Sequence, residues 1–454
     1  MAVSGSHGLR QGVTLRVHDD GPVGLDGVRI KFDDERVVSD AGLMLAATLV
    51  ERLGIEELAQ RLVRLRPKRP GAGSAGRKVM SLIYAMVLGA DSIDDCDVLR
   101  AGRTRRLLGG WIPAPSTLGT FLRAFTFGHV RQLDRLLGEA LTRAWRAGAG
   151  PGDGRLVVDV DSFVGEVCGK LKQGAAFGYT KLLGYHPLLA TRADTGEVLH
   201  ARLRKGSSQR GTKRFAEELI ARVRRAGASG ALTVRADAGF WNYALLDTLT
   251  RLGVRWSVTV RINPSIRTAI EAIEESAWRT IAYPDGGQAQ VAECVYVTGQ
   301  GRHRRQLRLV VRRTRLTEAA QRRLWPDWRH HAFITTVEVD QFHRDHATVE
   351  LAIRDLKEGA GLEHCPSGRF FANAAWLACA VLAHNLIRWT ARLGDVHPAE
   401  QLTVARTIRT RLLQLPGRLV NRSRQWVLRL PARWPWHSEF NTALDRIRSL
   451  PLLT

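Results

Sequence analysis

The stretch of residues 155–163, RLVVDVDSF, constrains the fold more than any other part of the chain. Its apolar residues are mostly β-branched, and no glycine or proline interrupts them, so it predicts a strand packed on both faces. Asp159 and Asp161 are two residues apart and therefore project from the same face of that strand. Two carboxylates this close need a cation or hydrogen-bond donors nearby if both are to remain ionised. Either one aspartate caps a turn while the other bonds to nearby backbone, or the strand presents a metal ligand. The rest of the chain favours the second interpretation.

A second acidic position follows another apolar stretch. Residues 231–236 predict a strand, and the chain continues directly as Asp237-Ala-Gly-Phe. An aspartate at the carboxyl end of a strand, followed closely by glycine, stands where the sites of open α/β sheets are usually built. Because Asp-x-Gly also forms ordinary turns, this position supports the metal-site interpretation without establishing it.

A third acid lies on a predicted amphipathic helix over residues 341–358. Projected at about 100° per residue, its apolar side chains face one way, and a narrow polar row follows one margin of that face. The row consists of His343, His346, Glu350 and Lys357, with Arg354 beside it. The alternative interpretation is an ordinary surface helix with mixed charges.

The charge balance points to a polyanionic partner. Lys and Arg number 68 against 44 Asp and Glu, a formal net charge of +24, which suits nucleic acid or an anionic membrane surface. The longest apolar run, residues 374–383, is too short to span a bilayer, and the N-terminal residues hold no apolar core typical of a signal peptide. The five cysteines form no CxxC pair, which argues against a zinc ribbon and favours a reducing compartment. We therefore expect a soluble intracellular protein that binds nucleic acid and has no membrane partner.

Composition and periodicity divide the chain into six segments. They are an N-terminal segment (1–40), a helical DNA-binding or dimerisation domain (41–150), the first part of an α/β domain (151–262), a mostly β insertion (263–330), the second part of the α/β domain (331–395) and a basic C-terminal region (396–454). A short strand is expected at Val28–Phe32, and Ser116 is predicted to be the N-cap of a helix.

Two basic stretches are candidates for DNA contact. Residues 202–214 supply the predicted contacts Arg204, Lys205, Lys213 and Arg214. From residue 401 onward the chain carries ten arginines and three tryptophans but only two acids. Arginine interleaved with aromatic residues suits phosphate contact and base stacking, and it also suits a tail that packs on the domain.

Several of these motifs resemble those of a known family. VDVDSF (158–163), RADAGFW (235–241), GYHPLLA (184–190) and TGEVLHARLRKG (195–206) are similar to motifs of the DDE transposases of bacterial insertion sequences, group 1. The family signature on the last helix is Tyr-x₂-Arg-x₃-Glu-x₆-Lys. Glu350 and Lys357 match it, whereas His343 and His346 stand at the Tyr and Arg positions.

The resemblance implies an α/β fold with an RNase H-like mixed sheet flanked by helices. With the segments inferred from composition, the expected fold also has the mostly β insertion, the N-terminal all-helical domain and the basic C-terminal tail. The expected catalytic and metal-binding acids are Asp161, Asp237 and Glu350, with Asp159 as the alternative to Asp161. Mg²⁺ is the expected cofactor, with Mn²⁺ as a substitute, because hard cations prefer carboxylate oxygens and two such ions suit phosphodiester chemistry.

The function implied is that of a metal-dependent DNA transposase. It would bind the terminal inverted repeats of its mobile element, cleave beside them and join the 3′-hydroxyl ends to target DNA. It would act as a homo-oligomer on DNA, in the bacterial cytoplasm at the nucleoid. The polar row of the last helix would contact DNA. The alternatives are a catalytically inactive DNA-binding protein of the same descent and an RNase H-like nuclease.

Overall fold

The computed structural model describes residues 25–65, 73–169, 171–178, 180–206, 208, 210–282, 288–300, 304–315, 328–337, 348–362, 364–396 and 404–453. The chain forms two units, one up to Glu35 and one from Arg36 onward. The described part of the first unit contains a single 3₁₀ turn, η1 (Leu25–Gly27). The prediction of a strand at Val28–Phe32 is wrong. Ile30 is 81% and Phe32 102% exposed, so these apolar side chains have no packing to hold an extended strand in place.

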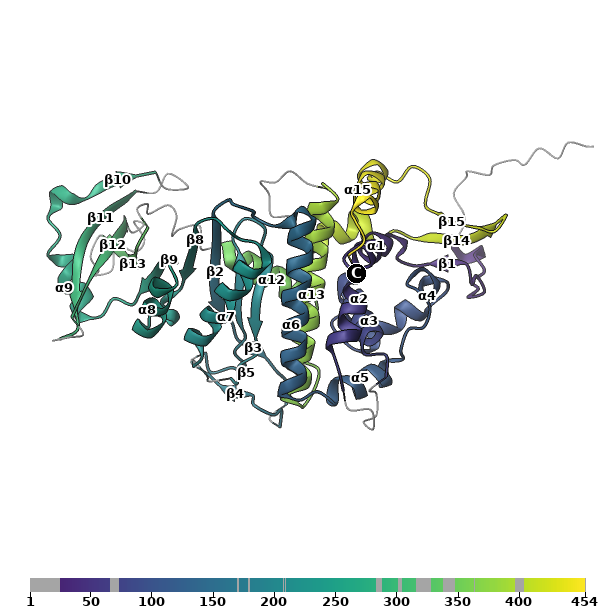
Figure 1. Ribbon diagram of the computed structural model, residues 1–454, viewed down its shortest axis with the longest axis horizontal. Coiled ribbons are helices and arrows are strands. Elements are labelled where there is room, and N and C mark those ends of the chain that lie inside the picture. The colour runs from purple at the N-terminus through teal and green to yellow at the C-terminus, as the bar shows by residue number, and fades with distance from the viewer. Residues whose placement is uncertain are drawn as a thin grey trace, which may run out of the picture. The chain divides into compact units, whose positions relative to one another are not determined.

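The second unit begins with a block of helices (Figure 1). Its helical elements are η2 (Ala41–Leu43), α1 (Met44–Arg52), α2 (Ile55–Leu62), α3 (Ala75–Leu88), η3 (Asp94–Arg100), α4 (Thr104–Leu107), α5 (Pro115–Arg123), α6 (Phe127–Ala144) and the π-helical turn η4 (Trp145–Ala149). The N-cap of α5 is Ala114 and not the predicted Ser116. Pro115 takes the first helical position, where its fixed φ suits the helix and its missing N–H costs nothing.

The helix α13 (Phe370–Leu393) runs through the centre of the unit (Figure 1). It contacts α3, α5 and α6 of the helical block on one side and a strand of the sheet on the other. By length and composition alone it could cross a membrane, but most of its apolar stretch is buried inside the protein. Trp376 and Trp389 are at most 2% exposed, which is the burial of a core helix. One continuous hydrophobic core therefore joins the helical block to the sheet.

The sheet has nine strands in the order β10-β11-β12-β13-β9-β8-β2-β6-β7. They are β2 (Leu156–Ser162), β6 (Leu188–Arg192), β7 (Val198–Arg202), β8 (Leu232–Ala236), β9 (Arg255–Val260), β10 (Arg279–Ile281), β11 (Ala289–Thr298), β12 (Arg305–Arg315) and β13 (Trp328–Thr335). Strand β2 pairs antiparallel with β6 and parallel with β8, and β8 pairs parallel with β9. Helices α7 (Thr212–Ala226) and α8 (Tyr243–Arg251) make the crossovers into β8 and β9.

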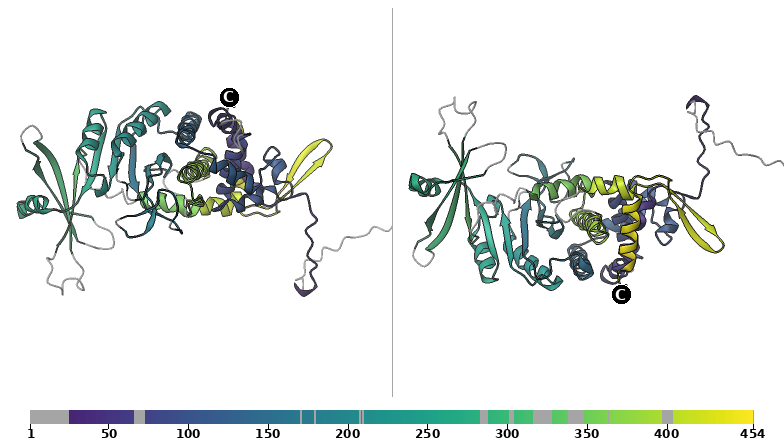
Figure 2. Two further views of the ribbon diagram at one scale, coloured as in Figure 1. Left: turned by 90° about the horizontal axis from the view of Figure 1, so that it is seen from below. Right: turned by 90° about the horizontal axis from the view of Figure 1, so that it is seen from above.

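This topology confirms the predicted fold class. Three antiparallel strands, β7-β6-β2, followed by two parallel strands, β8-β9, form an RNase H-like mixed sheet. The predicted insertion is mostly β, and its strands continue the same sheet from β9 outward through β13 (Figure 2). Around these strands lie the short elements β3 (Gly165–Glu166), β4 (Ala176–Phe177), β5 (Leu183–Tyr185), η5 (Ala238–Phe240), α9 (Pro264–Glu271) and η6 (Glu275–Ala277).

The basic C-terminal region is folded against the helical block. It contains α14 (Ala405–Ile408), the π-helical turn η10 (Arg409–Leu413), β14 (Gly417–Arg422), β15 (Gln425–Arg429) and α15 (His437–Ser449). Phe440 and Ile447 of α15 are buried, and this helix contacts α1 and α13. Strands β14 and β15 form a hairpin that pairs with β1 (Val37–Val38) in a separate three-stranded sheet. The region therefore packs on the protein through α15 and leaves its hairpin exposed, and contact of this region with DNA stays a prediction.

The helix that carries the third predicted acid, α12 (Thr348–Gly359), is held by a buried ion pair. Asp355 accepts hydrogen bonds from Arg388 Nη2 of α13 at 2.8 Å and from the backbone N–H of Ala405 at 2.7 Å. The side chains of Arg388 and Asp355 are only 10% and 6% exposed. Because a buried charge is costly without its partner, this contact fixes α12 on the core.

We predict that Asp355→Ala lowers the free energy of unfolding by about 3–5 kcal/mol, because it leaves the Arg388 guanidinium buried without a counter-charge. Urea unfolding followed by circular dichroism measures the change. Glu358→Ala, on the exposed side of the same helix, is the control and should change stability by less than about 0.5 kcal/mol. Equal effects of the two substitutions would show that the ion pair does not anchor α12.

Candidate active site

The parallel pairing of β2 with β8 brings two predicted acids together at one edge of the sheet. Val160 lies opposite Ala236, and Asp161 and Asp237 follow at the same offset of 76 residues (236 − 160 and 237 − 161). Asp237 directly follows the last residue of β8 and is exposed, and Asp161 is half-buried. Neighbouring residues of adjacent strands are about 5 Å apart, so the backbone positions of Asp161 and Asp237 are neighbours at the carboxyl end of the strands.

Backbone N–H groups orient both carboxylates. Ser162 N donates to Asp161 Oδ1 at 2.6 Å, and Gly239 N donates to Asp237 Oδ1 at 3.0 Å. The second bond makes Asp237 the N-cap of the 3₁₀ turn η5. The Asp-x-Gly sequence thus forms a turn, and the same turn holds the carboxylate at the accessible edge of the sheet.

Asp159 has a structural role, and its assignment as an alternative metal ligand is corrected. Arg235 Nε donates to its Oδ1 at 2.7 Å, and Arg235 Nη2 donates to its Oδ2 at 2.8 Å. The side chains of Asp159 and Arg235 are 0% and 2% exposed. Both carboxylate oxygens are therefore engaged inside the protein, away from the edge that Asp161 occupies. This geometry favours Asp161 as the strand's ligand.

Glu350 lies in the first turn of α12 and is exposed. Helix α12 contacts β2, and Lys357 Nζ lies 5.7 Å from the centroid of the Phe163 ring, two residues beyond Asp161. The helix therefore lies against the strand that carries Asp161. Within the described residues, however, no group of three or more His, Cys, Asp or Glu side chains is close enough together to hold a metal ion.

The donor chemistry suits a hard divalent cation, but the three-carboxylate geometry is not assembled. Asp161 and Asp237 are adjacent oxygen donors at an accessible edge, which is the kind of ligand that Mg²⁺ prefers. Glu350 would have to approach them to complete the predicted set.

The residues predicted to contact DNA differ in how far their side chains are exposed. Lys205, Lys213 and Arg354 are exposed, and Lys357 is half-buried. Arg214 is exposed and pairs with Glu218 at 3.0 Å. His343 and His346 lie outside the described residues.

The prediction for Arg204 is corrected, because this side chain turns inward. It is 7% exposed, and its Nε donates to the carbonyl of His186 at 3.0 Å. Burial lowers the pKa of Arg204 to about 10. Its guanidinium supports the backbone around His186 and is not presented to a ligand.

His186 lies beside the candidate site, although nothing in the sequence had singled it out. Its Nε2 is 3.1 Å from Ser162 Oγ, and its Nδ1 is 3.2 Å from the carbonyl oxygen of Ser208. Burial and the Arg204 guanidinium lower the pKa of His186, whereas the Ser208 carbonyl and the Asp237 carboxylate act in the opposite direction. A histidine within the apolar stretch GYHPLLA was the available signal, because a buried imidazole needs polar partners.

An RNase H-like sheet with carboxylates at the ends of its two central parallel strands places this chain in the RNase H-like class of proteins. The family model for the transposase DDE domain, group 1, matches residues 21–452, and the chain belongs to this family. The resemblance seen in the sequence is thus confirmed, and the chain is a DDE transposase.

Among solved structures, the chain is similar to the cryo-EM structure of a piggyBac transposase synaptic complex with hairpin DNA. The two are 11% identical with a TM-score of 0.44, and the match covers 92% of this chain and 84% of that one. A search of curated proteins finds no significant match.

We predict that Asp159→Leu lowers the free energy of unfolding by about 3–5 kcal/mol, because Arg235 is then a buried charge without a partner. The double variant Asp159→Leu/Arg235→Met should recover most of this loss, since apolar residues of similar volume replace buried ion pairs well. Chemical unfolding of both variants measures the difference. If the double variant is no more stable than the single one, the two side chains are not energetically coupled.

Proposed function

We propose that this transposase binds the ends of its mobile element, cleaves phosphodiester bonds there and transfers the 3′-hydroxyl ends into target DNA with the help of divalent metal ions. The observation that carries the proposal is the alignment of Asp161 with Asp237 at the carboxyl edge of adjacent parallel strands. The family generally uses divalent metal ions, and Mg²⁺ is the ion that these ligands suit, with Mn²⁺ as a substitute.

In this mechanism Asp161, Asp237 and Glu350 would hold the metal. The chemistry that divalent ions would supply there is activation of an oxygen nucleophile, stabilisation of the leaving oxygen and neutralisation of charge at phosphorus. The chain itself orients Asp161 and Asp237 through backbone N–H groups and holds α12 on α13 through the ion pair of Asp355 with Arg388. Exposed Lys205, Lys213 and Arg354 add positive charge that suits a DNA backbone.

A shift of the first turn of α12 on DNA binding would complete the site, while Asp355 holds the rest of the helix on α13. Glu350 is exposed in the first turn of the helix, and the carboxylates to which it must move are at the edge of the sheet that α12 contacts. The proposed assembly is a homo-oligomer on DNA, at the nucleoid of a bacterial cytoplasm.

We predict that Asp161→Asn, Asp237→Asn and Glu350→Gln each reduce cleavage of a duplex carrying the element's terminal inverted repeat by at least about 10³-fold in Mg²⁺. Each substitution removes a charged metal ligand and leaves the size of the side chain unchanged. Gel electrophoresis of an end-labelled duplex measures cleavage, and a mobility-shift assay without metal should show DNA binding largely retained. Glu358→Gln, an exposed acid on α12, is the matched control and should cleave at the parent rate.

The outcomes separate the alternatives. Absence of cleavage by the parent protein in Mg²⁺ and in Mn²⁺, with end binding intact, would indicate an inactive DNA-binding protein. If unrelated duplexes or RNA–DNA hybrids are cleaved as fast as the element end, and no strands are joined, the protein is an RNase H-like nuclease. If any of the three variants cleaves DNA as well as the parent protein does, the residue substituted in that variant is not a metal ligand.

A further inference from the structure

The β14–β15 hairpin separates apolar and basic side chains between its two faces. Alternation along β14 puts Arg418, Val420 and Arg422 on one face, and Arg429 of β15 lies directly opposite Arg418. On the other face Leu419 is 6% exposed and packs with Val38 and Ala41. The apolar face therefore fixes the hairpin to the protein, and the row of arginines faces outward.

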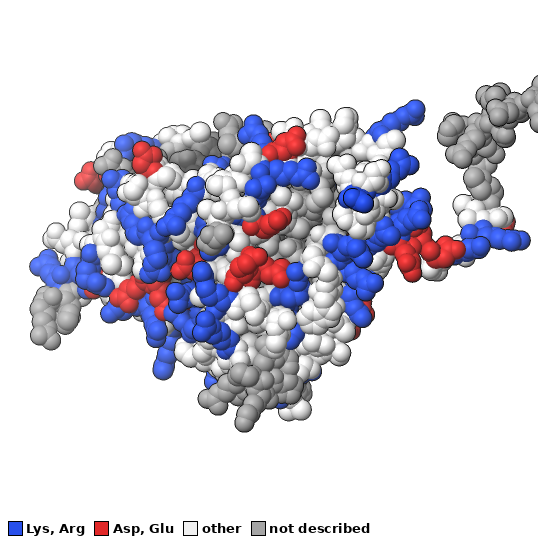
Figure 3. All heavy atoms as spheres, turned by 45° about the vertical axis from the view of Figure 1, so that its right-hand side comes forward, with Lys and Arg blue, Asp and Glu red and all other residues white. Residues whose placement is uncertain are grey.

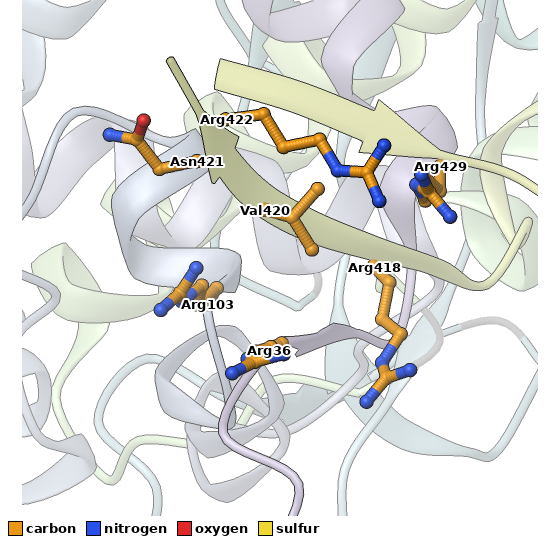
Figure 4. A pocket seen from close by; sticks show the side chains of 7 residues that line it. All are labelled: Arg36, Arg103, Arg418, Val420, Asn421, Arg422 and Arg429. Carbon is orange, nitrogen blue, oxygen red and sulfur yellow. The ribbon is translucent and has the colours of Figure 1, made fainter. Parts of the chain in front are cut away.

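Other parts of the chain add two more arginines to this row. A pocket of ≈ 340 Å³ is lined by five arginines, and none of the described residues that line it is acidic. The arginines are Arg36, Arg103, Arg418, Arg422 and Arg429. Figure 4 shows the Arg422 side chain running along the hairpin toward Arg429. Like charges gathered in one concave surface repel each other, so the arrangement favours binding of an anion.

The hairpin is held firmly enough to present these side chains. Arg103 Nη1 donates to the carbonyl oxygen of Leu419 at 2.7 Å, and Leu419 N donates to the carbonyl oxygen of Arg36 at 2.9 Å. Arg103 and Arg106 also lie over the Trp426 ring, 5.6 and 5.2 Å from its centroid. Backbone bonds and cation–π contacts therefore tie β14 and β15 to the segments around β1 and α4.

We infer that this arginine pocket binds the phosphate backbone of double-stranded DNA, at a surface separate from the metal site. The inference deepens the proposed function, because it names a surface that holds the DNA on which the transposase acts. The β14–β15 hairpin, which supplies most of the residues that line the pocket, lies on the far side of α13 and the helical block from β2 (Figure 1). It therefore contacts a part of the DNA other than the bond proposed to be cut.

The form of the surface favours a DNA backbone over a single small anion. Arg418 and Arg422 are four residues apart on a strand, about 13 Å, which corresponds to roughly four base-pair steps along the helix axis of B-DNA. Guanidinium groups bind phosphate oxygens in bidentate fashion. The five arginines come from three chain segments, so their charges are spread over the pocket, which suits successive phosphates better than one enclosed ion.

The test is the salt dependence of binding of a fluorescent mixed-sequence DNA duplex to the full chain, measured by anisotropy. The plot of log affinity against log salt should be shallower for Arg422→Gln/Arg429→Gln than for the parent, by roughly 0.9 for each phosphate that the variant no longer neutralises. Arg422→Lys/Arg429→Lys keeps both charges and should keep the parent slope. Because both arginines are exposed, the midpoint of thermal unfolding should not change.

A matched control is needed because basic side chains cover much of the surface (Figure 3). Arg225→Gln/Arg255→Gln removes the same charge from two exposed arginines near the amino ends of β8 and β9. This control should keep the parent slope. An equal change in both double variants would mean that the net charge of the protein, and not the pocket, binds DNA.

Two further outcomes would overturn the inference. A parent-like slope for Arg422→Gln/Arg429→Gln would show that the pocket does not contact DNA, while cleavage by the parent would leave the proposed function standing. A larger effect of that variant on an RNA duplex of the same sequence would assign the pocket to RNA. Conversely, if the variant weakens DNA binding but the parent never cleaves DNA, the pocket is supported and the proposed catalytic function fails.

Discussion

The ion pair between Asp159 and Arg235 sets the geometry on which the candidate site depends. It joins β2 to β8 inside the sheet, where neither charge has access to water. A shift of the pairing by one residue would turn each charged side chain to the opposite face and leave it buried without its partner. The pair therefore helps to specify the register, and the register places Asp161 beside Asp237 two residues further along. Strand β2 thus carries a structural aspartate, Asp159, and a candidate metal ligand, Asp161, two residues apart.

A second set of buried polar contacts makes the helical block and the sheet one unit. Glu197, directly before β7, is buried and accepts hydrogen bonds from the indole N–H groups of Trp145 and Trp389. Burial raises the pKa of Glu197, while the nearby Arg192 guanidinium and the two indole donors act in the opposite direction. The two tryptophans come from η4, at the end of the helical block, and from α13. Since a buried carboxylate without partners is costly, these contacts favour one arrangement of block and sheet.

The fold keeps the candidate metal site and the arginine pocket apart. Strand β2 contacts α12, whereas the β14–β15 hairpin that carries the arginine pocket lies beyond α13 and the helical block (Figure 1). The rigid core between them fixes the distance between a surface that would hold DNA and a site that would cut it. Such a separation suits a transposase, because a protein that recognises an element end must contact more of the DNA than the bond it breaks.

The sequence by itself determined the elements whose signals are local. The valine-rich stretch 155–163 contains β2, and Asp237 follows strand β8, both as the pattern of apolar residues predicts. Family motifs supplied the RNase H-like class, which the strand order confirms. Only the tertiary structure decided that Asp159 is paired with Arg235, that Arg204 turns inward, and that Arg36, Arg103 and Arg422 line one pocket. These outcomes depend on strand register and on packing between segments tens to hundreds of residues apart, and no local pattern of residues specifies which distant side chain will be the partner.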